Sequence, residues 1–143
     1  MPTIRSSTWT VLILLALSLL GCSEDEGALR GSLGDFYDFT HSTVRARLYN
    51  SELSIEYVRE NGQVPVRVSL DRIDGDPIST GEYSLGDRGR VTGRSGNNDI
   101  PQFLRGTLTL DAFSPSNGSQ IQGDFSARFA TGNDEASLTG EFD

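Results

Sequence analysis

The sequence predicts an all-β domain of antiparallel strands, folded as a curved β-sandwich or a flattened barrel of about seven to nine strands. Two observations predict this class. From Leu33 to the end of the chain, apolar and polar residues alternate with a period of two, and helical periodicity is almost lacking. Sixteen of the 143 residues are glycine, above the ordinary share of about 7%, which indicates the frequent turns and bends of an all-β chain.

The first part of this domain predicts three consecutive strands. Val44, Ala46 and Leu48 alternate with arginines and predict an early strand. Residues 53–57 and 64–70 alternate in the same way and flank the turn sequence Glu-Asn-Gly-Gln at 60–63, which is a strong hairpin signal. A turn centred on Asn61-Gly62 gives these opposing pairs on one face: Leu53 with Leu70, Ile55 with Val68, and Tyr57 with Val66.

The same register places Glu56 opposite Arg67 on the other face, as an opposite-charge cross-strand pair. A slip by one residue destroys both the apolar and the charged matches. Pro65 has no N–H to donate to a ladder, so we expect a four-residue loop that moves it to a non-hydrogen-bonded pair.

The rest of the domain predicts two shorter strands and a C-terminal meander. Residues 81–85 and 91–94 are the shorter strands. Residues 104–108, 121–125 and 138–142 share the pattern apolar-x-Gly-x-apolar, with glycines 17 residues apart at Gly106, Gly123 and Gly140. We interpret these segments as three antiparallel strands joined by turns at 114–120 and 131–135.

The three glycines lie on the same face as their apolar neighbours, so we expect them to point inward. A final turn centred on Gly132-Asn133 places Phe125 opposite Gly140 and Gly123 opposite Phe142. Aromatic rings would then cover bare backbone, as they do in coiled sheets. The alternative is that the glycines are incidental in a glycine-rich chain.

The sequence predicts three parts, which are a leader at 1–21, an acidic flexible tether at 22–32 and the β-domain at 33–143. Residues 9–20 are a nearly unbroken apolar run. As a helix this run spans about 18 Å, well short of the roughly 30 Å hydrocarbon core, which is typical of a signal peptide. Residues 23–32 are acidic, small and poor in apolar groups, as in a disordered linker.

The leader ends in Leu19-Leu20-Gly21-Cys22, which resembles the lipobox of bacterial lipoproteins. The resemblance implies cleavage before Cys22, diacylglyceryl lipidation of its sulfur and a location in the bacterial cell envelope. Ser23, in place of the aspartate that favours inner-membrane retention in such families, points to the outer membrane. The alternative is an ordinary secretory signal followed by a chance cysteine. The β-domain itself loosely resembles small Gly/Thr-rich lipoprotein domains of unknown function.

Composition limits the chemistry. A net charge of −8 disfavours nucleic-acid binding. All twelve basic residues are arginine, so no lysine is present for Schiff-base chemistry, and the single cysteine permits no intramolecular disulfide. No cofactor or metal site is predicted, because one histidine and a lipidated cysteine cannot form a zinc site.

Four weaker candidates for chemistry remain, and each has a plain structural alternative. His41 could act as a base but is expected to be an exposed loop residue. Asp71, Asp74 and Asp76 could hold calcium, although the spacing does not match an EF-hand and an acidic turn explains it as well. The basic segment 87–94 could bind phosphate or an acidic sugar, or be a solvated loop. The carboxylates of Glu52 and Glu56 are too far apart for a glycosidase pair.

These observations predict a lipid-anchored envelope protein with a non-enzymatic binding or structural β-domain, in contact with a membrane through its anchor. The alternative is a lipocalin-like carrier whose closed barrel holds a small apolar ligand. The two differ in the interior, which a carrier leaves open. A structural module fills it with these residues: Tyr57, Phe103, Leu110, Phe125 and Phe129.

Overall fold

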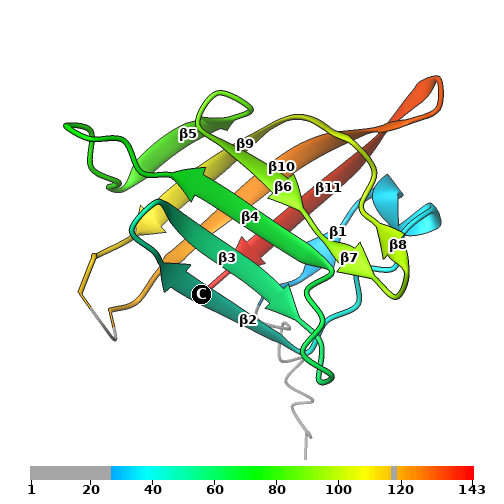
Figure 1. The fold of residues 1–143 in the computed structure, drawn as a ribbon, viewed down its shortest axis with the longest axis horizontal. Helices are drawn as coiled ribbons and strands as arrows, with labels where there is room; N and C mark the ends of the chain where they lie inside the picture. The colour runs from blue at the N-terminus through cyan, green and yellow to red at the C-terminus, as the bar shows by residue number, and fades with distance from the viewer. Residues whose placement is uncertain (1–26, 117–118) are drawn as a thin grey trace, which may run out of the picture.

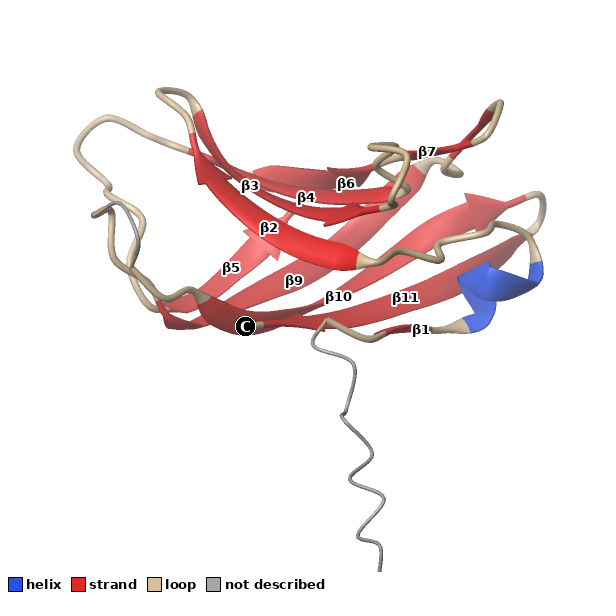
Figure 2. Cartoon of the chain, turned by 90° about the horizontal axis from the view of Figure 1, so that it is seen from below, coloured by secondary structure: helices blue, strands red, loops and turns tan. Residues whose placement is uncertain are grey.

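The fold consists of two antiparallel β-sheets that stack as curved layers (Figure 2). The computed structural model describes residues 27–116 and 119–143. Figure 1 shows a four-stranded sheet in front of a five-stranded one, and a small hairpin at one end. The predicted all-β class is therefore confirmed, in a sandwich-like arrangement.

The five-stranded sheet has the order β1-β11-β10-β9-β5, and the four-stranded sheet has the order β2-β3-β4-β6. The described residues contain eleven strands, more than the seven to nine predicted, because several are only two residues long. The strands of the first sheet are β1 (Leu29–Arg30), β5 (Gly81–Leu85), β9 (Phe103–Ala112), β10 (Gln122–Thr131) and β11 (Asp134–Phe142). The second sheet and the hairpin contain β2 (Thr43–Leu48), β3 (Glu52–Val58), β4 (Val66–Asp71), β6 (Gly89–Thr92), β7 (Arg94–Ser95) and β8 (Asn98–Asp99).

The predicted register of the β3–β4 hairpin is confirmed. Leu53 pairs with Leu70, Ile55 with Val68, Tyr57 with Val66 and Glu56 with Arg67. The connection is longer than the expected four residues, since β3 ends at Val58 and β4 begins at Val66. Pro65 therefore lies outside the ladder, where its missing N–H has no effect.

The predicted C-terminal meander is also confirmed, as β9, β10 and β11. Phe125 pairs with Gly140 and Gly123 pairs with Phe142, and both glycines are buried. A Cβ atom at Gly140 would overlap the ring of Phe125, so the ring occupies the space that a side chain would need. The inward glycines thus let aromatic rings cover the backbone where the sheet curves.

The ordered domain begins earlier than the predicted Leu33. Leu29 and Arg30 pair with Gly140 and Thr139 as an edge strand, and a short 3-10 helix, η1 (Ser32–Asp35), follows. The C-terminal part of the segment expected to be a tether therefore belongs to the sheet. The sequence reasoning missed this strand because two residues are too few to show alternation.

The core fills the space between the two sheets. Tyr57, Phe125 and Phe129 are fully buried, and the Tyr57 and Phe125 rings lie 5.9 Å apart. The Tyr57 hydroxyl donates a hydrogen bond of 2.8 Å to the carbonyl oxygen of Glu141, which joins β3 of one sheet to β11 of the other. At one side the chain passes from β5 in the first sheet to β6 in the second through a tight turn.

Candidate functional site

The outer surface of the four-stranded sheet carries four arginines, one or more from each of three strands. We call this surface the arginine face and define it by Arg45 and Arg47 of β2, Arg67 of β4 and Arg90 of β6. In each strand these arginines alternate with residues of the inner face, such as Val68 and Val91. Because side chains alternate across a sheet, the register brings them onto one surface.

One cross-strand row of this face is an ion triad, in which Arg45 and Arg67 flank Glu56. Arg45 Nε donates to Glu56 Oε2, and Arg67 Nη2 donates to Glu56 Oε1 at 2.6 Å. The Glu56 side chain is only 1% exposed, whereas each arginine side chain is 41% exposed. Burial works to raise the pKa of Glu56, but the hydrogen bond from Arg45 and the charge of Arg67 outweigh it and hold the pKa below its usual value.

The next row contains Arg47, Ser54, Ser69 and Arg90, in that order across the four strands. Both serines are buried. Within the described part of the chain, the one side-chain hydrogen bond of Arg47 goes to the hydroxyl of Tyr49, at 3.5 Å, and Arg90 lies 3.4 Å from Glu52 and 3.5 Å from Asp71. These contacts are long for charge-assisted hydrogen bonds, so the guanidinium groups at both ends of the row keep unused donors.

Two buried polar atoms on the arginine face have no hydrogen-bond partner within the described part of the chain. They are Ser54 Oγ and Arg67 Nε. A buried polar group without a partner costs roughly 1 to 3 kcal/mol, so each such group calls for an explanation, of which a bound water or ion is one. Ser54 is 0% exposed and lies beside Arg47 and Ser69 in the row.

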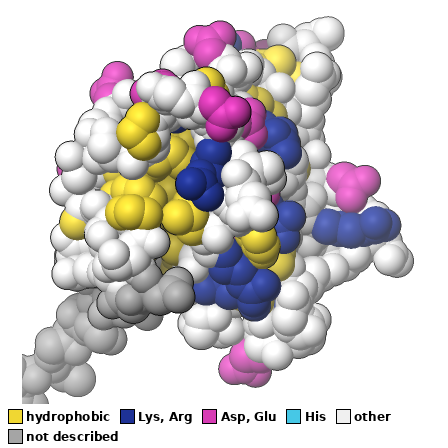
Figure 3. Space-filling view, turned by 60° about the vertical axis from the view of Figure 1, so that its left-hand side comes forward, with side chains coloured by type: hydrophobic (Ala, Val, Ile, Leu, Met, Phe, Trp, Pro, Cys, Tyr) yellow, Lys and Arg dark blue, Asp and Glu magenta, His cyan; other side chains and the backbone are white. Residues whose placement is uncertain are grey.

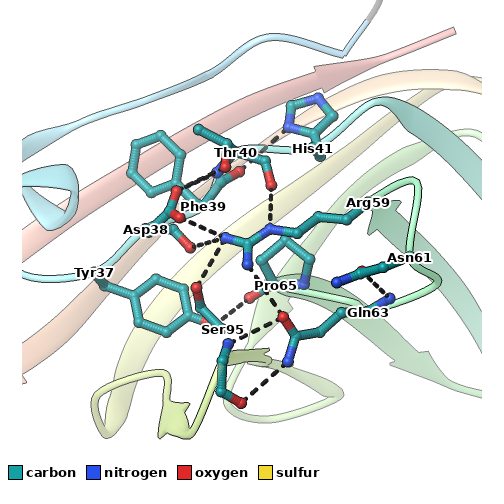
Figure 4. A network of polar contacts seen from close by, with 11 residues as sticks. Tyr37, Asp38, Phe39, Thr40, His41, Arg59, Asn61, Gln63, Pro65 and Ser95 are labelled. Atoms are coloured by element: carbon teal, nitrogen blue, oxygen red, sulfur yellow. Dashed lines mark hydrogen bonds and ion pairs between the residues drawn. The ribbon is translucent and has the colours of Figure 1, made fainter.

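Arg59 shows the opposite behaviour, because its donors are taken up by the protein (Figure 4). Its guanidinium group donates to the carbonyl oxygens of Thr40 and Asp38, to Ser95 Oγ and to Gln63 Oε1, at 2.8 to 3.1 Å. It also forms an ion pair of 2.8 Å with Asp38. This network joins the segment before β2 to the β3–β4 loop and the β7–β8 hairpin, so Arg59 has a structural role.

The outer surface of the five-stranded sheet has a different chemistry. A central row consists of Thr139, Ser126, Thr107 and Ser84, and Arg30 stands at its edge. The neighbouring row is acidic and contains Glu82, Thr109, Asp124 and Glu141. Burial, with the charges of Asp111, Glu141 and Glu82, raises the pKa of Asp124. These carboxylates are exposed, and no arginine is paired with Asp124 among the described residues.

Exposed apolar side chains lie close to one end of the arginine face. Leu48 and Tyr49 follow Arg47 in the chain, and Ile73 is half exposed. A shallow groove of about 360 Å³ runs between Leu48, Ile73 and Phe113. Figure 3 shows arginine side chains next to apolar side chains on one face of the molecule.

His41 lies in the segment before β2, as the sequence predicted, but it is not free of the core. Its ring stacks edge-on against Tyr57 with the ring centroids 5.0 Å apart, and Nδ1 is 3.3 Å from the carbonyl oxygen of Phe39. No carboxylate or hydroxyl of a catalytic triad contacts it in the described structure. The geometry assigns His41 a packing role.

The Asp71, Asp74 and Asp76 cluster is organised by an arginine. Arg88 donates to the Asp76 carboxylate at 2.6 Å and to the carbonyl oxygens of Asp76 and Asp71 at 2.7 and 3.1 Å. Asp74 sits in the tight turn that the bridge between Ile73 and Asp76 closes. The described residues contain no group of three side chains placed to hold a metal ion.

The remaining sequence candidates also take part in ion pairs. Glu52 contacts Arg90, and Glu56 is enclosed in its triad, so the two carboxylates act separately. The basic segment 87–94 is not a loop throughout, because residues 89–92 form β6. The strand directs Arg90 onto the arginine face, while Arg94 pairs with Asp99 in the β7–β8 hairpin at 3.6 Å.

Sequence reasoning missed the arginine face as a unit. The alternation of Arg45 and Arg47 in β2 and the Glu56–Arg67 pair were both visible. Their combination requires the β2–β3 register and the β4–β6 pairing. The second of these joins strands that are separated in the chain by β5, and no local pattern indicates it.

The leader, Cys22 and Ser23 lie outside the described residues. Within residues 27–116 and 119–143, the structure has no helix of the length and apolarity needed to span a bilayer. Comparisons of the chain with protein-family models, with curated proteins and with solved structures find no match. The resemblance to bacterial lipoproteins therefore rests on the leader and the residues around Cys22.

Proposed function

We propose that this chain is a lipid-anchored protein of the bacterial cell envelope, in the outer membrane, attached through Cys22. In this proposal its β-sandwich is a non-enzymatic binding module, and the arginine face is the binding surface. The observation that carries the binding role is the row Arg47–Ser54–Ser69–Arg90, which combines exposed, weakly paired guanidinium groups with a buried hydroxyl that has no partner.

The path of the chain is compatible with this arrangement. Gly27 packs against Val44 of β2, since a Cβ atom on Gly27 would overlap the Val44 side chain. Four residues separate Cys22 from Gly27, and the five residue-to-residue steps of an extended chain reach at most about 18 Å. A lipid on Cys22 would therefore keep the β2 edge of the arginine face close to the bilayer surface.

The packed interior favours a binding module over a lipocalin-like carrier. A carrier needs an open cavity for an apolar ligand. Here Tyr57, Leu110, Phe125 and Phe129 are buried between the sheets, and the Phe125 ring fills the space above Gly140. Native mass spectrometry after gentle purification separates the two functions, because a carrier would retain a stoichiometric apolar ligand.

The anchor is tested by intact-mass analysis and membrane fractionation of the wild-type chain and Cys22→Ala. We expect the wild type to lack residues 1–21, to carry the mass of its acyl groups and to sediment with membranes. The Cys22→Ala chain should lose the acyl mass and leave the membrane fraction, whereas the matched control Ser23→Ala should keep both. A soluble, unacylated wild-type protein would contradict the proposal.

A further inference from the structure

We infer that the arginine face binds phosphate groups, held between Arg47 and Arg90 over the serine pair Ser54 and Ser69. This inference rests on the proposed function, because it names the ligand of the binding surface proposed there. The ligand group is a phosphate monoester or inorganic phosphate, and it can come from a lipid headgroup or from a soluble compound.

The spacing of the row fits a clamp. Arg47 on β2 and Arg90 on β6 are separated by three inter-strand steps, or about 14 Å between backbones. The two positions between them are serines, which neighbouring side chains cover in this structure, since Ser54 is 0% and Ser69 2% exposed. The long side chains of Arg47 and Arg90 can swing aside and approach one anion from opposite directions, and this movement uncovers the Ser54 hydroxyl.

Several hydrogen-bond donors on this face are not used by the protein's own contacts. The carboxylates of Glu52 and Asp71 contact Arg90 only at 3.4 and 3.5 Å. Within the described residues, Arg47 has no carboxylate partner at all, and the Ser54 hydroxyl has no partner of any kind. The two guanidinium groups and the hydroxyl can therefore donate hydrogen bonds to a single ligand.

The charge balance of the face favours an anion. The face carries four arginines and the three carboxylates of Glu52, Glu56 and Asp71, so its own net charge is one positive charge. The whole chain has a net charge of −8. The attraction is therefore local, and a long polyanion such as nucleic acid would meet repulsion from the rest of the molecule. A compact, isolated anionic group suits this balance.

Phosphate fits the donor set better than a carboxylate does. A phosphate monoester carries about −1.5 to −2 charges and presents three oxygens in different directions. It can accept bidentate hydrogen bonds from one guanidinium group and still bind a second arginine and a hydroxyl. A carboxylate has two oxygens in one plane and would leave part of this donor set unused.

The test is a titration of the lipidated full-length mature protein in a neutral detergent with inorganic phosphate, followed by the ¹⁵N signals of the arginine Nε–H groups. We expect phosphate to shift the Arg47 and Arg90 signals, and acetate to shift them less at the same concentration. Replacement of either arginine by glutamine should weaken phosphate binding roughly tenfold, the effect of one hydrogen bond to a charged group. Arg128→Gln on the other sheet removes the same charge and should leave phosphate binding unchanged.

Ser54→Ala separates a binding role from a structural one. The hydroxyl has no protein partner, so its removal should not lower the free energy of unfolding, but it should weaken phosphate binding several-fold. Equal phosphate affinity in Ser54→Ala, Arg47→Gln, Arg90→Gln and the wild type would overturn the inference.

A second arm distinguishes the sources of the phosphate group. The same signals are followed when the lipidated protein is placed in vesicles of phosphatidic acid, whose headgroup is a phosphate monoester, or of a neutral glycolipid without phosphate. Shifts in the phosphatidic acid vesicles that Arg47→Gln abolishes identify headgroup phosphate, and shifts with inorganic phosphate alone identify a soluble ligand. No shift in either arm, in a protein shown by mass to be acylated, would refute the phosphate site and leave the anchor intact, whereas an unacylated mass would refute the anchor.

Discussion

The two sheets of the sandwich have similar inner faces and opposite outer faces. Leu53, Ile55 and Val68 of the four-stranded sheet pack against Leu108 and Phe125 of the five-stranded sheet in one core. On the outside, the four-stranded sheet buries the Glu56 carboxylate beneath arginines, whereas the five-stranded sheet exposes its hydroxyl and acidic rows to water.

This difference shows that the two sheets depend on different interactions. In β3, residues of both faces are buried, because long arginine side chains from β2 and β4 cover the outer one. Charged contacts on that face are therefore partly shielded from solvent and should contribute to stability. The five-stranded sheet has no such cover, and its glycines allow the close approach of backbone and rings on the inside.

The largest effect is expected in the five-stranded sheet, from Gly123→Ala. A Cβ atom at this position would overlap the backbone carbonyl oxygen of Thr109 in the neighbouring strand, which cannot move without distorting β9. We expect the free energy of unfolding to fall by about 3 kcal/mol. Urea denaturation measures this change.

Gly34→Ala is the matched control for that substitution. Its Cβ atom would lie 3.1 Å from the ring of Phe39, a side chain that can shift, so we expect a much smaller loss. If both variants were as stable as the wild type, close backbone approach would not be what the five-stranded sheet requires.

The second effect tests the four-stranded sheet, through Glu56→Ala. The substitution leaves Arg45 and Arg67 without their shared carboxylate, and the two cations then repel each other. Because both arginines are partly exposed, we expect a loss of about 2 kcal/mol, below the roughly 3 to 5 kcal/mol typical of a fully buried pair.

Glu135→Ala provides the comparison on the other sheet. Glu135 accepts two hydrogen bonds from Arg105, at 2.8 and 2.7 Å, but this pair stands in solvent. Thermal unfolding of the two variants should therefore show a clear decrease for Glu56→Ala and little change for Glu135→Ala. Equal decreases in the unfolding temperature would show that the arginine side chains over Glu56 do not strengthen its ion pairs.

A smaller effect is expected where the two sheets are joined. Tyr57→Phe removes the hydroxyl that donates to the Glu141 carbonyl oxygen, and it retains the ring that packs on Phe125. We expect a loss of about 1 kcal/mol, the usual net value of one hydrogen bond. Hydrogen exchange should show faster opening of the amides of β11 near Glu141, and an unchanged exchange pattern would argue against this role.

Strand pairs joined by a short turn could be predicted from the sequence in both sheets. The turn residues and the alternation of apolar and polar residues together determine the register of such a pair. Asn61-Gly62 and Gly132-Asn133 mark the turns, and each leads directly to a register, such as Ile55 with Val68 or Phe125 with Gly140. A one-residue slip would expose every apolar side chain of the strand, so only one register was physically acceptable.

Pairings between distant segments could not be predicted in this way. β1 pairs with β11, more than 100 residues later, and β6 returns to the four-stranded sheet after β5 has joined the other one. Arg90 lies in the same cross-strand row as Arg47 and Ser54 only because β6 pairs with β4. The candidate site was therefore missed, although each of its residues was visible in the sequence.

The smallest effect concerns pH, and it should have opposite signs on the two outer faces. The pKa of Glu56 is lowered in the folded protein, so its stabilising contribution is complete above its ordinary value of 4.5 and is lost as the pH falls through the lower folded value. The pKa of Asp124 is raised by burial and by its acidic neighbours. Its ionised form therefore destabilises the fold at neutral pH, and this penalty disappears as the pH falls towards the ordinary value of 3.8.

Asp124→Asn should therefore stabilise the protein at pH 7 by a few tenths of a kcal/mol, as expected for an exposed position. The advantage should vanish by pH 3, where the wild-type carboxyl is protonated in both states. Glu56→Gln should show the reverse, with a deficit at pH 7 that shrinks on acidification. Urea denaturation between pH 7 and pH 3 measures both slopes, and parallel pH profiles for the two variants would show that the two faces do not differ in how they hold their carboxylates.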